Sequence, residues 1–255
     1  MQPDCANFAI GDLHYNEVAV GWRAVTGFGF ERARTPEAKR ARQEAILAAA
    51  AGLATANGVR EVTASAIADE VGMHKSAMLR YFETREDIFL QLAVGAWGEW
   101  SAAVRGELEN LTARPSAGRL EWDRTAREIA AVIARSLVSR PLFCDLLAHT
   151  PLNLERNVSL ERVRAFKTRA IAVTAEVSAT LCTVTPLRFD QAHSVVATAT
   201  AMAGAMWQMA APGTKLRDFY ESEPELAHAV VDVEPQLTDI VGALLAGYAA
   251  RSATQ

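Results

Sequence analysis

Residues 63–82, which read TASAIADEVGMHKSAMLRYF, constrain the fold of this chain more than any other segment. Thr63 carries a side-chain oxygen that can cap a helix beginning at the next residue, where small and apolar residues fill about two turns. Gly72 stands where the chain must leave this helix, because a residue without a Cβ atom tolerates the left-handed conformation that closes many helices. A second short helix is predicted from His74 to about Tyr81. Two helices joined by a tight turn with glycine are typical of the helix-turn-helix, whose second helix enters the major groove of DNA.

The flanking sequence predicts one further helix on each side of this unit. Upstream, the Thr-Pro-Glu at 35–37 is a helix start, with a capping threonine, a proline at the first helical position and an acid in the first turn. Apolar residues then recur at helical spacing until the Asn-Gly at 57–58 ends the run. Downstream, Thr84 can cap a helix that begins at Arg85. The predicted order is helix, helix, turn, helix, helix.

This order and its residues resemble the TetR family of bacterial transcriptional regulators. The matching residues are Ile46-Leu47-Ala48-Ala49-Ala50, Gly58, Thr63, Ile67-Ala68, Val71-Gly72-Met73, Lys75-Ser76, Tyr81-Phe82 and Thr84-Arg85-Glu86. The resemblance implies an all-α fold with a helix-turn-helix DNA-binding domain at 35–84 and a larger helical effector-binding and dimerisation domain at 85–255. It also implies a ligand-responsive regulator, expected to be a repressor that a small molecule releases from a palindromic operator. Activation instead of repression stays open.

The resemblance assigns DNA contacts to a set of residues in and beside the two short helices. These are Thr63, Ser65, His74, Lys75, Ser76, Leu79, Tyr81 and Arg85. It places Thr63 and Tyr81 on the DNA backbone, Ser65, Lys75 and Ser76 nearest to base edges, and Arg85 close to a phosphate. Core packing is the alternative for Tyr81 and the adjacent phenylalanine.

The sequence departs from the usual family pattern within this set. His74 stands where the family commonly has Ser or Thr, Ala77 where Thr is frequent, and Leu79 where Tyr is common. Because these departures remove hydroxyls that would contact phosphates, the operator cannot be taken from relatives. Lysine can donate to guanine or to a phosphate, so both roles remain open for Lys75.

The charge distribution favours a DNA-binding N-terminal region despite a net charge of −4. Residues 32–42 contain five bases and one acid, whereas residues 217–239 contain seven acids and one base. The local field governs contact with phosphates, so the overall acidity does not exclude DNA. An ordinary solvated helix face is the alternative for any single base in that run.

Residues 1–34 differ from the rest, because glycines and acids interrupt their short apolar pieces. No basic start is followed by an apolar run, so we expect no secretion signal and a cytoplasmic protein without a membrane segment. The segment is interpreted as a flexible extension or as the product of an early start codon. Arg32 and Arg34 could bring its end to a minor groove.

Beyond residue 90 the apolar periodicity predicts further helices, with no strand and no repeat. Bulky apolar residues in them could line an effector cavity. They are Trp97, Trp100, Trp122, Phe143, Phe166, Met202 and Trp207, each with core packing as its alternative.

The last two long helices, predicted near 190–209 and from 234, carry the expectation of a homodimer. The resemblance implies that they form a four-helix bundle with a second copy, and two DNA half-sites ~34–36 Å apart demand two reading helices. The predicted interface residues are Val195, Val196, Ala199, Met202, Ala203, Met206, Leu237, Ile240, Leu244 and Tyr248. The alternative is that these helices only close the core of one protomer.

Other classes of function find little support in the sequence. The chain has no Gly-x-Ser-x-Gly, His-Glu-x-x-His, Walker or Gly-x-Gly-x-x-Gly motif, so we expect no enzyme and no cofactor. Cys5, Cys144 and Cys182 lie far apart, so we expect no metal site. A protein-binding adaptor with a degenerate helix-turn-helix is the alternative function.

Overall fold

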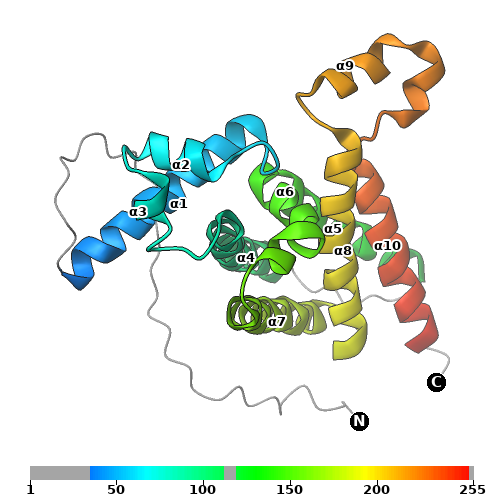
Figure 1. The fold of residues 1–255 in the computed structure, drawn as a ribbon. Coiled ribbons are helices and arrows are strands. Elements are labelled where there is room, and N and C mark those ends of the chain that lie inside the picture. The colour runs from blue at the N-terminus through cyan, green and yellow to red at the C-terminus, as the bar shows by residue number, and fades with distance from the viewer. Residues whose placement is uncertain (1–34, 112–118, 253–255) are drawn as a thin grey trace.

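The computed structural model of the protein describes residues 35–111 and 119–252, whose arrangement Figure 1 shows. The predicted extension at 1–34, with Arg32, Arg34 and Cys5, lies outside the described residues. In chain order the helices are α1 (Pro36–Asn57), α2 (Ala64–Glu70), α3 (Lys75–Met78), α4 (Arg85–Asn110), α5 (Arg119–Val138), α6 (Pro141–His149), α7 (Leu160–Val184), α8 (Phe189–Ala210), α9 (Lys215–Ser222) and α10 (Val233–Ser252). Every regular element in the two described ranges is helical, which confirms the predicted all-α fold.

Local capping signals explain where four of these helices begin. The threonine or serine side chain accepts a bond from the amide three residues on, at Thr35–Ala38 (3.2 Å), Thr63–Ala66 (3.1 Å), Thr84–Asp87 (3.1 Å) and Ser159–Arg162 (3.3 Å). Each such bond stabilises a helix by roughly 0.5–2 kcal/mol, because it satisfies an amide with no partner inside the helix. Gly58 (φ 84°) and Gly72 (φ 65°) adopt the left-handed conformation at the two predicted helix ends.

The second helix of the turn unit is shorter than the sequence predicts. Only Lys75–Met78 is α-helical, and residues 79–81 continue as a turn in which the Tyr81 amide donates to the Met78 carbonyl at 2.9 Å. Four further elements were not predicted: the π-helix η1 (Thr150–Leu154) and the 3-10 turn η2 (Glu155–Asn157), which extend α6, and α9 with the 3-10 helix η3 (Pro224–Ala229). Their lengths are too short for apolar periodicity to reveal them.

The helices form a small N-terminal head and a larger helical body that α4 joins (Figure 1). In the head, Ile46, Ile67, Met78 and Phe82 from α1, α2, α3 and the following turn share one buried core. In the body, α4 packs on α5 and α7, α6 packs on α8, and α10 packs on both α5 and α8. Within the described ranges, no helix has the length and apolar character needed to span a membrane.

Candidate nucleic-acid interface and its helical support

Most of the predicted contact residues of the head are exposed. The side chains of Thr63, Ser65, His74, Lys75 and Ser76 are exposed, Leu79 is 38% exposed, and Tyr81 is half-buried. Lys75 and Ser76 are the first two residues of α3, so their polar atoms stand at its N-terminus, the end that a helix-turn-helix directs toward base edges.

The opposite side of this unit is fixed by apolar packing. Met78 is fully buried and Phe82 is 2% exposed, so Phe82 is a core residue. The turn before α3 is closed by bonds from the Gly72 amide to the Asp69 carbonyl (3.0 Å) and from the Met73 amide to the Ala68 carbonyl (2.9 Å). The exposed N-terminus of α3 is therefore held rigidly by the head.

Arg85 has a different position from the one expected. Its guanidinium donates to the carbonyl oxygens of Val59 and Val62, in the loop between α1 and α2, and pairs with Glu86 at 2.9 Å. It also lies over the Phe89 ring, 4.6 Å from the centroid. These contacts direct the Arg85 guanidinium toward the loop between α1 and α2, so Arg85 joins the head to α4.

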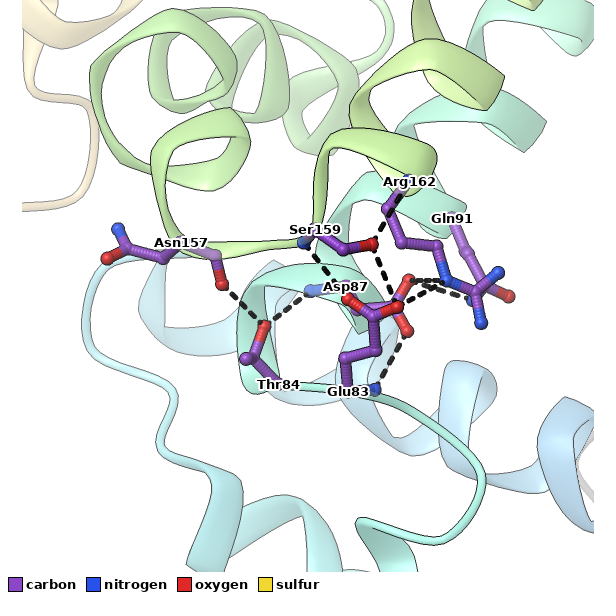
Figure 2. A network of polar contacts seen from close by, with 7 residues as sticks. All are labelled: Glu83, Thr84, Asp87, Gln91, Asn157, Ser159 and Arg162. Atoms are coloured by element: carbon purple, nitrogen blue, oxygen red, sulfur yellow. Dashed lines mark hydrogen bonds and ion pairs between the residues drawn. The ribbon is translucent and has the colours of Figure 1, made fainter.

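A second set of polar contacts joins the start of α4 to the start of α7 (Figure 2). The Glu83 carboxylate accepts bonds from the Ser159 amide (3.0 Å) and hydroxyl (2.9 Å), and pairs with Arg162 at 3.5 Å. These bonds from Ser159, with the charge of Arg162, hold the pKa of Glu83 below its ordinary value. The hydroxyl of Thr84 donates to the Asn157 carbonyl at 3.1 Å.

The buried Asp87 carboxylate completes this network from within α4. It accepts bonds from the Glu83 amide (3.0 Å) and the Gln91 amide group (3.1 Å), and its Oδ1 lies 3.4 Å from the Nε of Arg162. Both oxygens of the buried Asp87 side chain therefore have polar partners. The start of α4 is thus tied to the body as well as to the head.

The aromatic residues predicted to line a cavity are partly a packed core. Trp97, Trp100 and Phe143 contact one another with centroids 5.3–5.9 Å apart, and Trp100 donates to the Ser136 hydroxyl at 2.9 Å. Phe166 is also buried, whereas Trp122, Met202 and Trp207 are half-buried against the core. The first three residues therefore serve in core packing, because their ring faces and edges fill each other's space.

Two protein-family models match this chain. Residues 46–92 match the model for "Bacterial regulatory proteins, tetR family", and residues 95–252 match the model for "Tetracyclin repressor-like, C-terminal domain". The chain belongs to the TetR family. No curated protein matches it.

Solved structures of other bacterial regulators are similar to this chain. The fatty acid degradation regulator FadR from Bacillus halodurans is 14% identical, with 80% of this chain and 94% of that chain covered and a TM-score of 0.51. FadR from Bacillus subtilis, solved with stearoyl-CoA, is 17% identical, with coverage of 74% and 99% and a TM-score of 0.46. A putative regulator from Mesorhizobium loti is 14% identical, with coverage of 83% and 96% and a TM-score of 0.47. At these identities the likeness concerns the fold alone.

In this TetR-family protein, most of the predicted interface residues lie inside the protomer. Val195, Val196, Ala199, Ala203, Met206 and Leu237 are all buried in one chain. Because α5, α6, α7 and α10 pack on α8, and α5 and α8 pack on α10, these residues offer little surface to a second copy. Ile240 is exposed, and Met202, Leu244 and Tyr248 are half-buried.

The outward face of α8 and α10 instead carries small residues that the sequence prediction missed. Ala197, Ala201 and Ala205 follow one another at four-residue spacing on α8, and Ala243 and Gly247 do so on α10. All five are exposed, and α8 and α10 lie side by side (Figure 1). Small residues at this spacing permit close approach of another helix pair.

Two cysteines, Cys144 and Cys182, lie in the parts of the regulator that the structure describes, and they form no disulfide there. Burial, with the adjacent Asp145 charge, raises the pKa of the Cys144 thiol to about 12, and Cys182 is half-buried. No group of three or more His, Cys, Asp or Glu that could hold a metal occurs in the described ranges.

Proposed function

We propose that this TetR-family regulator binds its operator through the exposed surface formed by α2 and the N-terminus of α3. Lys75 and Ser76 contact base edges, Ser65 lies beside them, and Thr63 and Tyr81 contact the sugar-phosphate backbone. The observation that carries this assignment is the exposure of Lys75 and Ser76 at the N-terminus of a helix whose other side is fully packed. Lys39 and Arg40, exposed on α1, add to the positive field.

The regulator acts as a homodimer through the outward faces of α8 and α10. Two copies place two reading heads on the half-sites of a palindrome. It functions by binding and not by catalysis, in the cytoplasm, with a small molecule that weakens operator binding. Among the described residues, the Ser101 hydroxyl and the Trp122 indole nitrogen are buried without a hydrogen-bond partner, and we propose that they contact polar atoms of the effector.

The effector changes the spacing of the heads through α4. The start of α4 contacts both the head, by Arg85, and the start of α7, by Glu83 and Asp87. An effector that prefers the body conformation with displaced α4 moves the heads away from half-site spacing. If a ligand saturates the body without weakening operator binding, this mechanism is wrong even though DNA binding stands.

Replacing Lys75 by alanine is expected to weaken binding to the DNA that flanks the regulator's own gene. A base contact would lower affinity for the operator by about 1–3 kcal/mol and relax its sequence preference, whereas a phosphate contact would weaken binding to every duplex and reduce the salt slope by about 1. Gel shift over a salt series measures both. Lys215→Ala, on exposed α9, removes the same charge away from the head and should leave binding unchanged. Equal, weak binding of wild type and Lys75→Ala to all duplexes would favour the adaptor alternative.

Replacing Ala201 by arginine is expected to convert the dimer to a monomer. The change places a long charged side chain on the small-residue face of α8, where it prevents close helix approach and leaves a charge in an apolar interface. Sedimentation at micromolar concentration gives the mass. Ala102→Arg, on an exposed face of α4, is the matched control and should remain dimeric. An unchanged mass for Ala201→Arg would place the interface elsewhere.

A further inference from the structure

A buried carboxylate on α6 holds the loop of the reading head from the side opposite to Arg85. Asp145 Oδ2 accepts a 2.6 Å bond from the Val59 amide, across 86 residues of sequence. The carbonyl of the same Val59 accepts from Arg85 of α4. Val59 in the α1–α2 loop therefore bonds to two helices of the body. Its amide donates to Asp145 of α6, and its carbonyl accepts from Arg85 of α4.

The other oxygen of this carboxylate faces α8. Asp145 Oδ1 accepts a 2.7 Å bond from the Gln208 side chain and lies 3.3 Å from His149 Nε2. Burial acts to raise the pKa of Asp145, but the bonds from His149, Val59 and Gln208 outweigh it and lower the pKa below its ordinary value. Asp145 is thus an ionised group whose two oxygens connect different parts of the molecule.

The helices α6 and α8 approach each other closely at Gly204. A Cβ atom at Gly204 would lie 2.8 Å from the Ala148 amide nitrogen and 3.1 Å from the Leu147 carbonyl carbon. Gly204 is one turn before Gln208 on α8, and Ala148 is one turn after Asp145 on α6. The Asp145–Gln208 bond therefore lies beside a close contact between the backbones of α6 and α8.

We propose that Asp145 is a positioning residue that fixes the reading head directly to α8, by a path through α6 that does not include α4. Because α8 carries part of the proposed dimer face, this path sets the position of each head relative to the two-fold axis. A displacement of α8 then moves Gln208 and Asp145, and through them the Val59 amide, and so changes DNA binding. The inference rests on the proposed function of the head, but its structural part is tested separately.

Amide hydrogen exchange of the full-length dimer tests the path at its end point. In Asp145→Ala the side chain has no acceptor, so it can bond neither the Val59 amide nor Gln208. We expect exchange at Val59 to accelerate at least tenfold, with α8 core amides such as that of Val195 unchanged. In Gln208→Ala we expect exchange at Val59 to accelerate at least threefold, although these residues do not touch. The double variant should match Asp145→Ala, because both changes act on one path.

The same variants are then compared in binding to the DNA that flanks the gene. Both single variants should weaken binding at least fivefold, whereas the exposed controls Asp218→Ala and Gln236→Ala should change neither exchange nor binding. Unchanged exchange at Val59 in Asp145→Ala overturns the proposal. So does a Gln208→Ala protein with wild-type exchange there, or an equal acceleration of the α8 amides, which would mark global loosening. Wild-type protein that binds no DNA contradicts the proposed function and leaves the exchange result valid.

Discussion

The Trp100→Ala protein is expected to lose about 3–5 kcal/mol of unfolding free energy, a larger loss than any other substitution proposed for this regulator. Trp100 is fully buried between Trp97 and Phe143, and its indole nitrogen donates to Ser136. Truncation removes the apolar transfer energy of the ring and leaves a cavity that its neighbours can fill only in part. A total stability of about 5–15 kcal/mol is normal for a domain, so the variant should be close to unfolding at 37 °C.

Urea denaturation followed by circular dichroism measures this loss at fixed protein concentration, since dimerisation contributes to apparent stability. Ile171→Ala is the control, because Ile171 is 62% exposed on α7 and should change stability by less than about 0.5 kcal/mol. The outcome also separates the two interpretations of the aromatic cluster. A Trp100→Ala protein with wild-type stability would mean that the ring lines an open cavity.

Gly204→Ala is expected to destabilise the regulator by about 1–3 kcal/mol, although alanine is normally the better helix former. The added methyl group would stand 2.8 Å from the Ala148 amide nitrogen, and that neighbour is backbone that cannot rotate aside. The helices α6 and α8 must therefore separate, which loosens the packing around them.

Gly95→Ala is expected to change the stability of the protein in the opposite direction. Gly95 lies within α4, and no neighbouring atom stands within 4 Å of the position that a methyl group would take there, so alanine should stabilise the protein by about 0.5–1 kcal/mol. Thermal unfolding of the two variants should shift in opposite directions. A stabilised Gly204→Ala protein would show that α6 and α8 separate at little energetic cost. The higher helix propensity of alanine would then outweigh that cost.

Much of the fold could be predicted because its signals are local. Thr63 and Thr84 cap the helices that follow them, and Gly58 and Gly72 end the helices before them. Capping and left-handed turns depend on neighbours within a few residues, so the local sequence is enough to predict them. The exposed surface of Lys75 and Ser76 follows from the same local pattern, whereas their contacts with DNA remain predictions.

The interface residues show where such reasoning fails. Apolar periodicity identified one face of α8, with Val195 and Val196 on it, but periodicity does not say whether the same chain or a second copy covers that face. In this protein the same chain covers it. The outward face has alanines, such as Ala197 and Ala201. Alanine contributes little to an apolar pattern, so periodicity does not mark this face.

Arg85 and Asp145 could not be assigned from sequence for another reason. Their shared partner is Val59, 26 and 86 residues away, and in both cases the bonded group is backbone, which has no sequence signature. A charged residue beside a DNA-binding unit is reasonably interpreted as a phosphate contact. Only the fold reveals that the Arg85 charge is directed to carbonyl oxygens instead.

The bonds between Glu83 and Ser159 bear on how such regulators can be recombined. Residue 84 is the natural cut point for transferring a reading head, yet the Glu83 carboxylate has its donors 76 residues further along the chain, at the start of α7 (Figure 2). A hybrid cut there would carry an acid whose donors stayed behind in the original body. A transplanted head needs Ser159 and Arg162 equivalents in its new host, which makes the start of α7 part of the exchangeable module.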